Sequence, residues 1–202
     1  MTRMPVHAAV ALGSNLGDRL AAPDGASRAL ARLLDGVVIS RFIETAAEGV
    51  GEQPPFLNGA AVGLWGGGAR ALLEALLAIE RDAGRERPYS GAPRILDLDL
   101  ILFGSAVIDE PGLAVPHPRF RERGFVLGPL SEIAPNLVDP VTGATVAALH
   151  RAWLAQSARR GGPDPLPGPA IRLPGSGEPA LSARMTVCEP RPPAGGGRIS
   201  EA

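Results

Sequence analysis

The stretch PRILDLDLILF, residues 93–103, is the feature that most limits how this chain can fold. Side chains on a β-strand point to opposite faces with a period of two residues. The stretch therefore predicts a strand over residues 95–103 with a leucine face suited to a core: Leu96, Leu98, Leu100 and Leu102. Asp97 and Asp99 then share the other face, with Cα atoms roughly 6–7 Å apart. One face of the predicted sheet is apolar, and the other carries neighbouring carboxylates.

Segments typical of strands and helices alternate along the rest of the first 160 residues. Apolar or β-branched runs predict three more strands, at residues 6–12, 37–45 and 56–64. Leucines at helical spacing predict helices at 17–34 and 69–83, and a short helix is expected at 126–133. The order β-α-β-β-α-β predicts an α+β fold, the ferredoxin-like α/β sandwich, in which helices pack on an antiparallel sheet.

The C-terminal part has a different composition. From Gly161 onward, 42 residues contain 8 Gly and 9 Pro with few large apolar side chains. Such a segment buries too little surface to offset its ordering entropy. We expect a compact domain at residues 1–156 and a poorly ordered Gly/Pro-rich tail at 157–202, in which residues 170–173 could add an edge strand.

Composition excludes several functional classes. All 20 basic residues are arginine, so Schiff-base chemistry and a P-loop lysine are impossible. The single Cys188 rules out cysteine-rich metal sites, and the net charge of −1 argues against binding nucleic acid or membranes through bulk charge. No apolar run reaches the ~18 residues of a membrane span. We expect a cytoplasmic protein, monomeric, without membrane or nucleic-acid partners.

Two clusters of basic residues lie near the acidic strand in sequence. Arg85, Arg87 and Arg94 surround the loop before it, and guanidinium groups bind phosphates with two parallel hydrogen bonds. His117 and Arg123 follow it in the segment PHPRFRERGF. The first cluster, beside two carboxylates that suit Mg²⁺, suggests a polyphosphate–metal site. A solvated acidic face, a solvated arginine loop and a structural histidine remain the alternatives.

Two phenylalanines are candidates for stacking on a ring. Phe56 lies beside Asn58, whose amide both donates and accepts hydrogen bonds and so suits a heterocycle edge. Phe125 follows the second basic cluster, and either ring could instead pack in the core. The turn Gly13-Ser14-Asn15-Leu16-Gly17 lacks the full dinucleotide-binding pattern and is more typical of a strand-to-helix turn.

Taken together, these segments resemble the 6-hydroxymethyl-7,8-dihydropterin pyrophosphokinase family. The matching motifs occur in the family's order between about residues 6 and 153: ALGSNLG at 11–17, Thr45, FLNGA at 56–60, Ile79-Glu80, GRER at 84–87, PRILDLD at 93–99, VPHP at 115–118 and RGFVL at 123–127.

The resemblance implies an ATP-dependent diphosphotransferase of folate biosynthesis. It would transfer pyrophosphate from ATP to the hydroxymethyl group of the pterin and release AMP. It also implies a ferredoxin-like fold and two Mg²⁺ ions held by Asp97 and Asp99. A non-catalytic ferredoxin-like ligand-binding module and an ordinary kinase releasing ADP are the other hypotheses.

The resemblance also implies roles for individual residues. Those expected to hold the phosphates of ATP are Arg85, Arg87, Arg94, His117 and Arg123, with the backbone near Leu100 against the adenine. Phe56 and Phe125 would sandwich the pterin. Asn58 and the segment from Thr45 to Glu48 would bind the pterin edge.

Overall fold

The structure is a computed structural model that describes residues 4–46, 53–84, 93–160 and 170–173. Its elements follow one another in this order: β1 Val6–Ser14, α1 Ala21–Leu33, β2 Asp35–Ile39, β3 Ile43–Thr45, β4 Phe56–Trp65, α2 Ala69–Asp82, β5 Asp97–Phe103, β6 Ile108–Glu110, β7 Leu113–Val115, the 3₁₀ turn η1 Phe120–Glu122, α3 Gly124–Ile133 and α4 Val146–Arg159.

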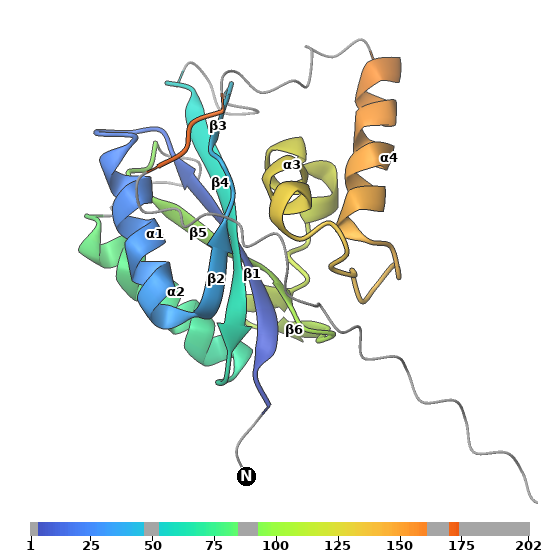
Figure 1. The fold of residues 1–202 in the computed structure, drawn as a ribbon, viewed down its shortest axis with the longest axis horizontal. Helices are drawn as coiled ribbons and strands as arrows, with labels where there is room; N and C mark the ends of the chain where they lie inside the picture. Colours follow the sequence, from blue (N-terminus) through green and yellow to red (C-terminus); the bar gives the residue numbers. More distant parts are fainter. Residues whose placement is uncertain (1–3, 47–52, 85–92, 161–169, 174–202) are drawn as a thin grey trace, which may run out of the picture.

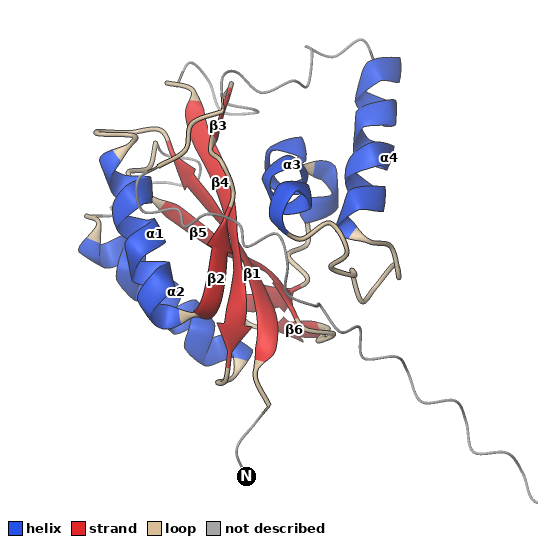
Figure 2. Cartoon of the chain, in the orientation of Figure 1, coloured by secondary structure: helices blue, strands red, loops and turns tan. Residues whose placement is uncertain are grey.

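The main sheet is antiparallel, with the strand order β2-β4-β1-β5. The short strand β3 pairs with β4 as well, beyond the end of β2. Helices α1 and α2 cover one face of the sheet, and α3 with α4 lies on the opposite side (Figures 1 and 2). This order of elements and strands confirms the ferredoxin-like prediction, with β6, β7, α3 and α4 as the extra elements.

Each face of the sheet has its own apolar cluster. Small and branched residues of β1 alternate between the two, so that Val10 and Leu12 pack on the side of α1 and α2. Ala9 and Ala11 pack on the side of α3. The interior of β1 is thus buried on both faces, as its continuous apolar sequence predicts.

A β-bulge in β5 changes which face of the sheet one of its leucines occupies. Leu100 pairs with Val10 but Leu102 pairs with Ala9, so Ile101 is an extra residue on β5. Such a residue shifts the alternation beyond it. Leu98 and Leu100 pack toward α1 and α2 as expected, whereas Leu102 packs with Ile101 on the α3 side. The expectation that all four leucines share one face was therefore wrong at Leu102.

Several element boundaries also differ from the predictions. The expected strand at 37–45 is two strands, β2 and β3, separated by residues 40–42. Helix α1 begins at Ala21, because Asp18 Oδ1 accepts hydrogen bonds from the N–H groups of Leu20 and Ala21, both 3.0 Å long. These bonds lower the pKa of Asp18. Pro23 therefore falls in the first turn, where proline is tolerated.

The C-terminal region contains structure that the sequence analysis did not expect. Helix α4 was not predicted, although Thr145 caps it by accepting a 3.2 Å hydrogen bond from the N–H of Ala148. It spans the expected boundary at residue 156, so the division into domain and tail stays a prediction. The expected edge strand at 170–173 is a single β-bridge between Ile171 and Phe42. Of the described helices, none has the length and apolarity needed to cross a bilayer.

The close contact between Gly59 and Phe42 leads to a prediction about stability. A Cβ atom added to Gly59 would lie 2.7 Å from Cε1 of the fully buried Phe42 ring. Gly59→Ala should therefore destabilise the fold by about 1–3 kcal/mol, the range for overpacked cores. Urea unfolding measures the change. Gly25→Ala in α1 is the control, because its added Cβ would meet nothing within 4 Å and should be neutral or stabilising. Equal stability of the two variants would contradict the prediction.

Candidate active site

The two aspartates lie side by side at one edge of the sheet. Asp97 pairs with Gly13 of β1, and Asp99 pairs with Ala11, so both side chains project toward the side of α3. Their side chains are 16% and 36% exposed, respectively. The sequence prediction that the carboxylates share one face is thus confirmed, and both are accessible to a ligand.

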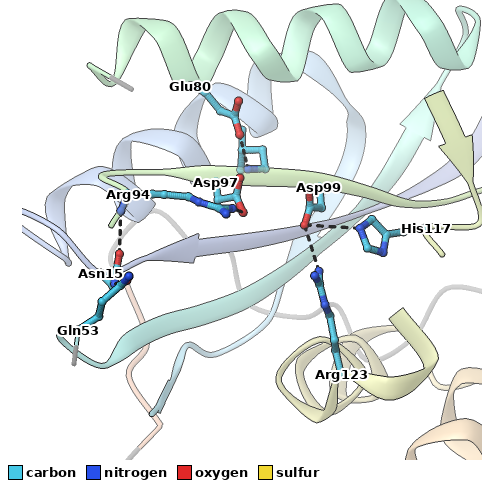
Figure 3. A network of polar contacts seen from close by, with 9 residues as sticks. Asn15, Gln53, Glu80, Arg94, Asp97, Asp99, His117 and Arg123 are labelled. Carbon is cyan, nitrogen blue, oxygen red and sulfur yellow. Dashed lines mark hydrogen bonds and ion pairs between the residues drawn. The ribbon is translucent and has the colours of Figure 1, made fainter. Parts of the chain in front are cut away.

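Three basic side chains surround this pair (Figure 3). Arg94, just before β5, forms an ion pair with Asp97. Arg123 Nη1 lies 3.5 Å from Asp99 Oδ2, and His117 Nε2 lies 4.0 Å from the same oxygen. Residues far apart in the sequence therefore converge on one acidic centre, where both positive and negative groups face the same space.

Burial and neighbouring charges shift the pKa values of Asp99 and His117. Burial raises the pKa of Asp99, and the neighbouring Asp97 raises it further, against the opposing effect of His117 and the arginines. Burial also lowers the pKa of His117, although Asp99 acts in the opposite direction. Burial beside a second carboxylate thus disfavours the charged form of Asp99, and a bound divalent cation would offset this effect. Among the described residues no third acidic, histidine or cysteine ligand completes a metal cluster. Two carboxylates still suit Mg²⁺, which usually keeps waters and substrate phosphates in its coordination shell.

The β-bulge positions His117. The N–H of His117 donates a 2.9 Å hydrogen bond to the carbonyl of Ile101, the extra residue of β5. Asp99 is two residues before Ile101 on β5, so this hydrogen bond keeps the side chain of His117 beside Asp99. The bulge at Ile101 thus positions His117, a candidate site residue, and bulges are common next to active sites.

The turn η1 positions Arg123. Phe120 is fully buried, and Trp153 of α4 donates a 3.0 Å hydrogen bond from Nε1 to the carbonyl of Glu122. Arg121 donates two 2.7 Å hydrogen bonds to the buried carboxylate of Asp139, in the loop between α3 and α4. These contacts fix the backbone of residues 120–122, directly before Arg123.

An aromatic and amide cluster adjoins the acidic pair on the same face. Asn58 pairs with Gly13 across β1 and β4, and its Nδ2 donates a 2.7 Å hydrogen bond to Thr45 Oγ1. A Cβ atom at Gly13 would lie 3.3 Å from Asn58 Oδ1, 3.9 Å from Asp97 Cβ and 4.0 Å from Phe56 Cδ1. Glycine at this position therefore leaves open the space where the two groups of residues meet.

Phe125, in the first turn of α3, lies beside Arg123 of the acidic centre. Its ring is half-buried against the core on that side, and the Arg123 guanidinium carbon lies 5.7 Å from the ring centroid. An aromatic face is thus presented beside one of the basic groups of the acidic centre.

Comparison with known proteins decides which family has this arrangement. The family model described as 7,8-dihydro-6-hydroxymethylpterin-pyrophosphokinase (HPPK) matches residues 9–135. The chain belongs to this HPPK family. It is 41% identical over 145 residues to the 2-amino-4-hydroxy-6-hydroxymethyldihydropteridine pyrophosphokinase of Synechocystis, which covers 70% of this chain and 73% of the relative. The enzyme of that name from Pseudomonas aeruginosa is 42% identical over 133 residues, or 65% of this chain and 82% of the relative.

Some relatives are longer proteins. The chain spans 29% of the Arabidopsis thaliana mitochondrial folate synthesis bifunctional protein, to which it is 38% identical over 164 residues, 79% of its own length. A crystal structure of a Plasmodium falciparum HPPK-DHPS mutant has a TM-score of 0.67 at 13% identity, covering 81% of this chain and 47% of that chain. This structural similarity supports the fold.

Membership in the HPPK family confirms three sequence-based predictions: the family resemblance, the pyrophosphokinase function in folate synthesis and the enzyme class. The alternative of a non-catalytic ligand-binding module receives no support from these comparisons.

The predicted site residues of this HPPK chain divide into three groups. One group converges on the two clusters described above: Thr45, Phe56, Asn58, Arg94, Asp97, Asp99, His117, Arg123 and Phe125. Glu48, Arg85 and Arg87 lie outside the described residues. Leu100 has a buried side chain, so only its backbone can meet a ligand. Leu98 directs its N–H to the free edge of β5, where it donates to Glu80, and the backbone of Leu100 points to the same edge.

Sequence reasoning missed Asn15 as an organiser of the HPPK site. Its Oδ1 accepts a 2.8 Å hydrogen bond from the N–H of Arg94, and its Nδ2 donates to Gln53 and to the carbonyl of Pro54. The buried Asn15 therefore joins the segments before β4 and before β5. The sequence signal was present in the motif at residues 13–17, but it gives no indication of partners 38 to 79 residues away.

Proposed function

We propose that this chain performs the family's reaction with the described residues as its active site. It transfers pyrophosphate from ATP to the hydroxymethyl oxygen of 6-hydroxymethyl-7,8-dihydropterin, giving AMP and the pterin diphosphate. The observation that supports the proposal most strongly is the acidic pair of Asp97 and Asp99, which faces three basic groups and adjoins an aromatic–amide cluster.

Asp97 and Asp99 are the residues that would hold Mg²⁺, and we propose two ions. When bound, the ions would neutralise the triphosphate charge and polarise the attacking hydroxyl group. The raised pKa of Asp99 supports this role, because burial and the neighbouring Asp97 disfavour its charged form, which a bound cation would favour. The protein's further contribution is to bind and orient the two substrates.

The basic residues would bind the phosphates of ATP. Arg94, His117 and Arg123 approach the acidic pair from different segments, and arginine matches phosphate geometry. Arg85 and Arg87, which lie outside the described residues, are proposed for the same role from the sequence. The adenine would lie against the free backbone edge near Leu100. Since charge accumulates on the transferred group in phosphoryl transfer, positioned cations stabilise the transition state.

The aromatic–amide cluster would bind the pterin. Phe56 and Phe125 are the proposed stacking rings, and Thr45, Glu48 and Asn58 are the proposed contacts to the polar edge. Because Asn58 Nδ2 already donates to Thr45, the orientation of its amide is set before a ligand binds. A preorganised amide loses less entropy when it recognises a heterocycle.

The test is to incubate the full chain with ATP, Mg²⁺ and hydroxymethyl-dihydropterin, and to separate the nucleotides by chromatography. We expect AMP and pterin diphosphate in equal amounts, and neither product when the pterin is omitted. Formation of ADP would indicate an ordinary kinase instead. Pterin binding without nucleotide turnover would favour the non-catalytic module. A cytoplasmic location, a monomeric state and the absence of nucleic-acid partners stay predictions.

A further inference from the structure

The last described segment, residues 170–173, lies outside the region matched by the family model but returns to the sheet beside β3 (Figure 1, orange-red trace). The N–H of Phe42 donates to the carbonyl of Ile171 at 2.8 Å, and the N–H of Ile171 donates back at 2.7 Å. Leu173 is 4% exposed and packs in the core on the side of α1 and α2. We call residues 170–173 the strap, because it crosses the sheet edge and is anchored in the core.

Phe42 packs on the α1 and α2 side of the sheet, behind the strand that carries the proposed substrate contacts. Its buried ring fills the space over Gly59, with Cε1 2.7 Å from the position of an added Cβ atom. Gly59 adjoins Asn58, and Ile43, which follows Phe42, pairs with Asn58. The strap therefore holds the residue directly behind the hydrogen bond between Asn58 and Thr45.

The short strand β3 needs such an anchor. It has three residues, fewer than any other strand of the main sheet, and forms three pairs with β4. The N–H and C=O groups of Phe42, directly before β3, form hydrogen bonds with Ile171. Without Ile171, these two backbone groups would lose the partners that they have in this structure. Short edge strands with few partners open locally at low free energy.

We propose that the strap is a positioning segment for the pterin half of the active site. By pairing with Phe42 it keeps β3 in one place against β4, so that Thr45 and Asn58 present a fixed edge to the substrate. The inference rests on the proposed function. The ATP half is separated from β3 by β4 and β1, because the acidic pair stands on β5. Loss of the strap should therefore weaken pterin binding selectively.

The test variant is Ile171→Pro in the full chain, which removes the N–H that bonds to Phe42. We expect KM for the pterin to rise about fivefold, as for the net loss of one hydrogen bond, with kcat and KM for ATP nearly unchanged. Ala170→Pro is the matched control, because it places the same ring at an exposed neighbouring position and leaves the Ile171 N–H intact. Ile171→Val, which keeps the N–H, should behave like the unmodified chain.

Hydrogen exchange gives a second measurement that is independent of activity. The amides of β3 should exchange faster in Ile171→Pro than in Ala170→Pro, whereas those of β5 should not change. If Ile171→Pro does not fold, Leu173→Ala weakens the buried anchor instead and should show the same selectivity. An equal rise in both KM values, an unchanged pterin KM, or unchanged exchange in β3 would overturn the inference. An unmodified chain that forms no AMP would refute the proposed function, and exchange in β3 would still decide whether the strap orders that strand.

Discussion

Replacing either aspartate of the acidic pair should reduce AMP formation at least ~100-fold, the typical size of losing one preorganised electrostatic group. Asp97→Asn and Asp99→Asn keep the side-chain volume but remove the charge that would hold Mg²⁺. Each substitution also removes the partner of a basic group: Arg94 for Asp97, and Arg123 with His117 for Asp99. The loss should appear in kcat, because the missing charge acts on the transferring phosphate.

The measurement is steady-state AMP formation at saturating ATP and pterin over a range of Mg²⁺ concentrations. Asp109→Asn on β6 is a control, because that carboxylate is exposed on a separate two-stranded sheet. It should leave activity unchanged. Near-normal turnover in Asp97→Asn or Asp99→Asn, with folding confirmed by circular dichroism, would refute the assignment of these residues as metal ligands.

Breaking the ion pair between Arg121 and Asp139 should reduce the stability of the fold more than the other substitutions proposed for it. Asp139 has a side chain with no exposed surface, and it accepts hydrogen bonds from Arg121, Thr142 and the N–H of Val141. Asp139→Ala removes these acceptors and leaves Arg121 without its partner. We expect the free energy of unfolding to fall by about 3 kcal/mol, because breaking a buried pair leaves an uncompensated charge.

Urea unfolding measures this change, and Glu110→Ala is the comparison. Glu110 forms an ion pair with Arg70, but both side chains are about half exposed. Exposed pairs contribute about 0–1 kcal/mol, so this loss should be several-fold smaller. Similar losses in the two variants would show that burial of Asp139 does not set the energy of its pair.

The Asp139 pair also predicts a pH dependence. Burial alone would raise the pKa of Asp139, but the hydrogen bonds from Arg121, Thr142 and Val141 outweigh it and lower the value to about 2. Its contribution to stability is therefore fully present above pH 4 and lost as the pH falls toward 2. Unfolding midpoints measured across this range should fall less steeply for Asp139→Ala than for the unmodified chain. Parallel pH profiles would contradict the lowered pKa.

Loss of this pair should also affect the position of Arg123 in the candidate active site, because Arg121 is only two residues before it. The turn η1 is anchored by the buried Phe120 and by the hydrogen bonds from Arg121 to Asp139, whereas Arg123 faces Asp99. A looser turn would weaken the approach of Arg123 to the phosphates without removing any residue that touches the substrates. The structural role of Arg121 and the role proposed for Arg123 therefore belong to neighbouring residues of one segment.

Much of the chemistry could be predicted from local sequence. The alternation of leucine and aspartate placed Asp97 and Asp99 on one face, because the direction of a side chain on a strand depends only on its place in the period. The alternation of strands and helices predicted the ferredoxin-like fold. The five alanines spread along α4 favoured a helix, which the sequence analysis did not include because the apolar stripe of this segment is short.

Tertiary structure alone decided how distant residues meet. The bulge at Ile101 turned Leu102 to the other face and gave His117 its backbone partner, although no local pattern marks it. Arg123 reached Asp99, Asn15 reached Arg94, and the strap reached Phe42 through pairings across 24, 79 and 129 positions of sequence. Such contacts depend on strand register and on which surfaces pack together, and these are properties of the whole folded chain. The sequence alone thus determined which chemical groups are present and which face of a regular strand they occupy. Only the tertiary structure determined which distant groups come into contact.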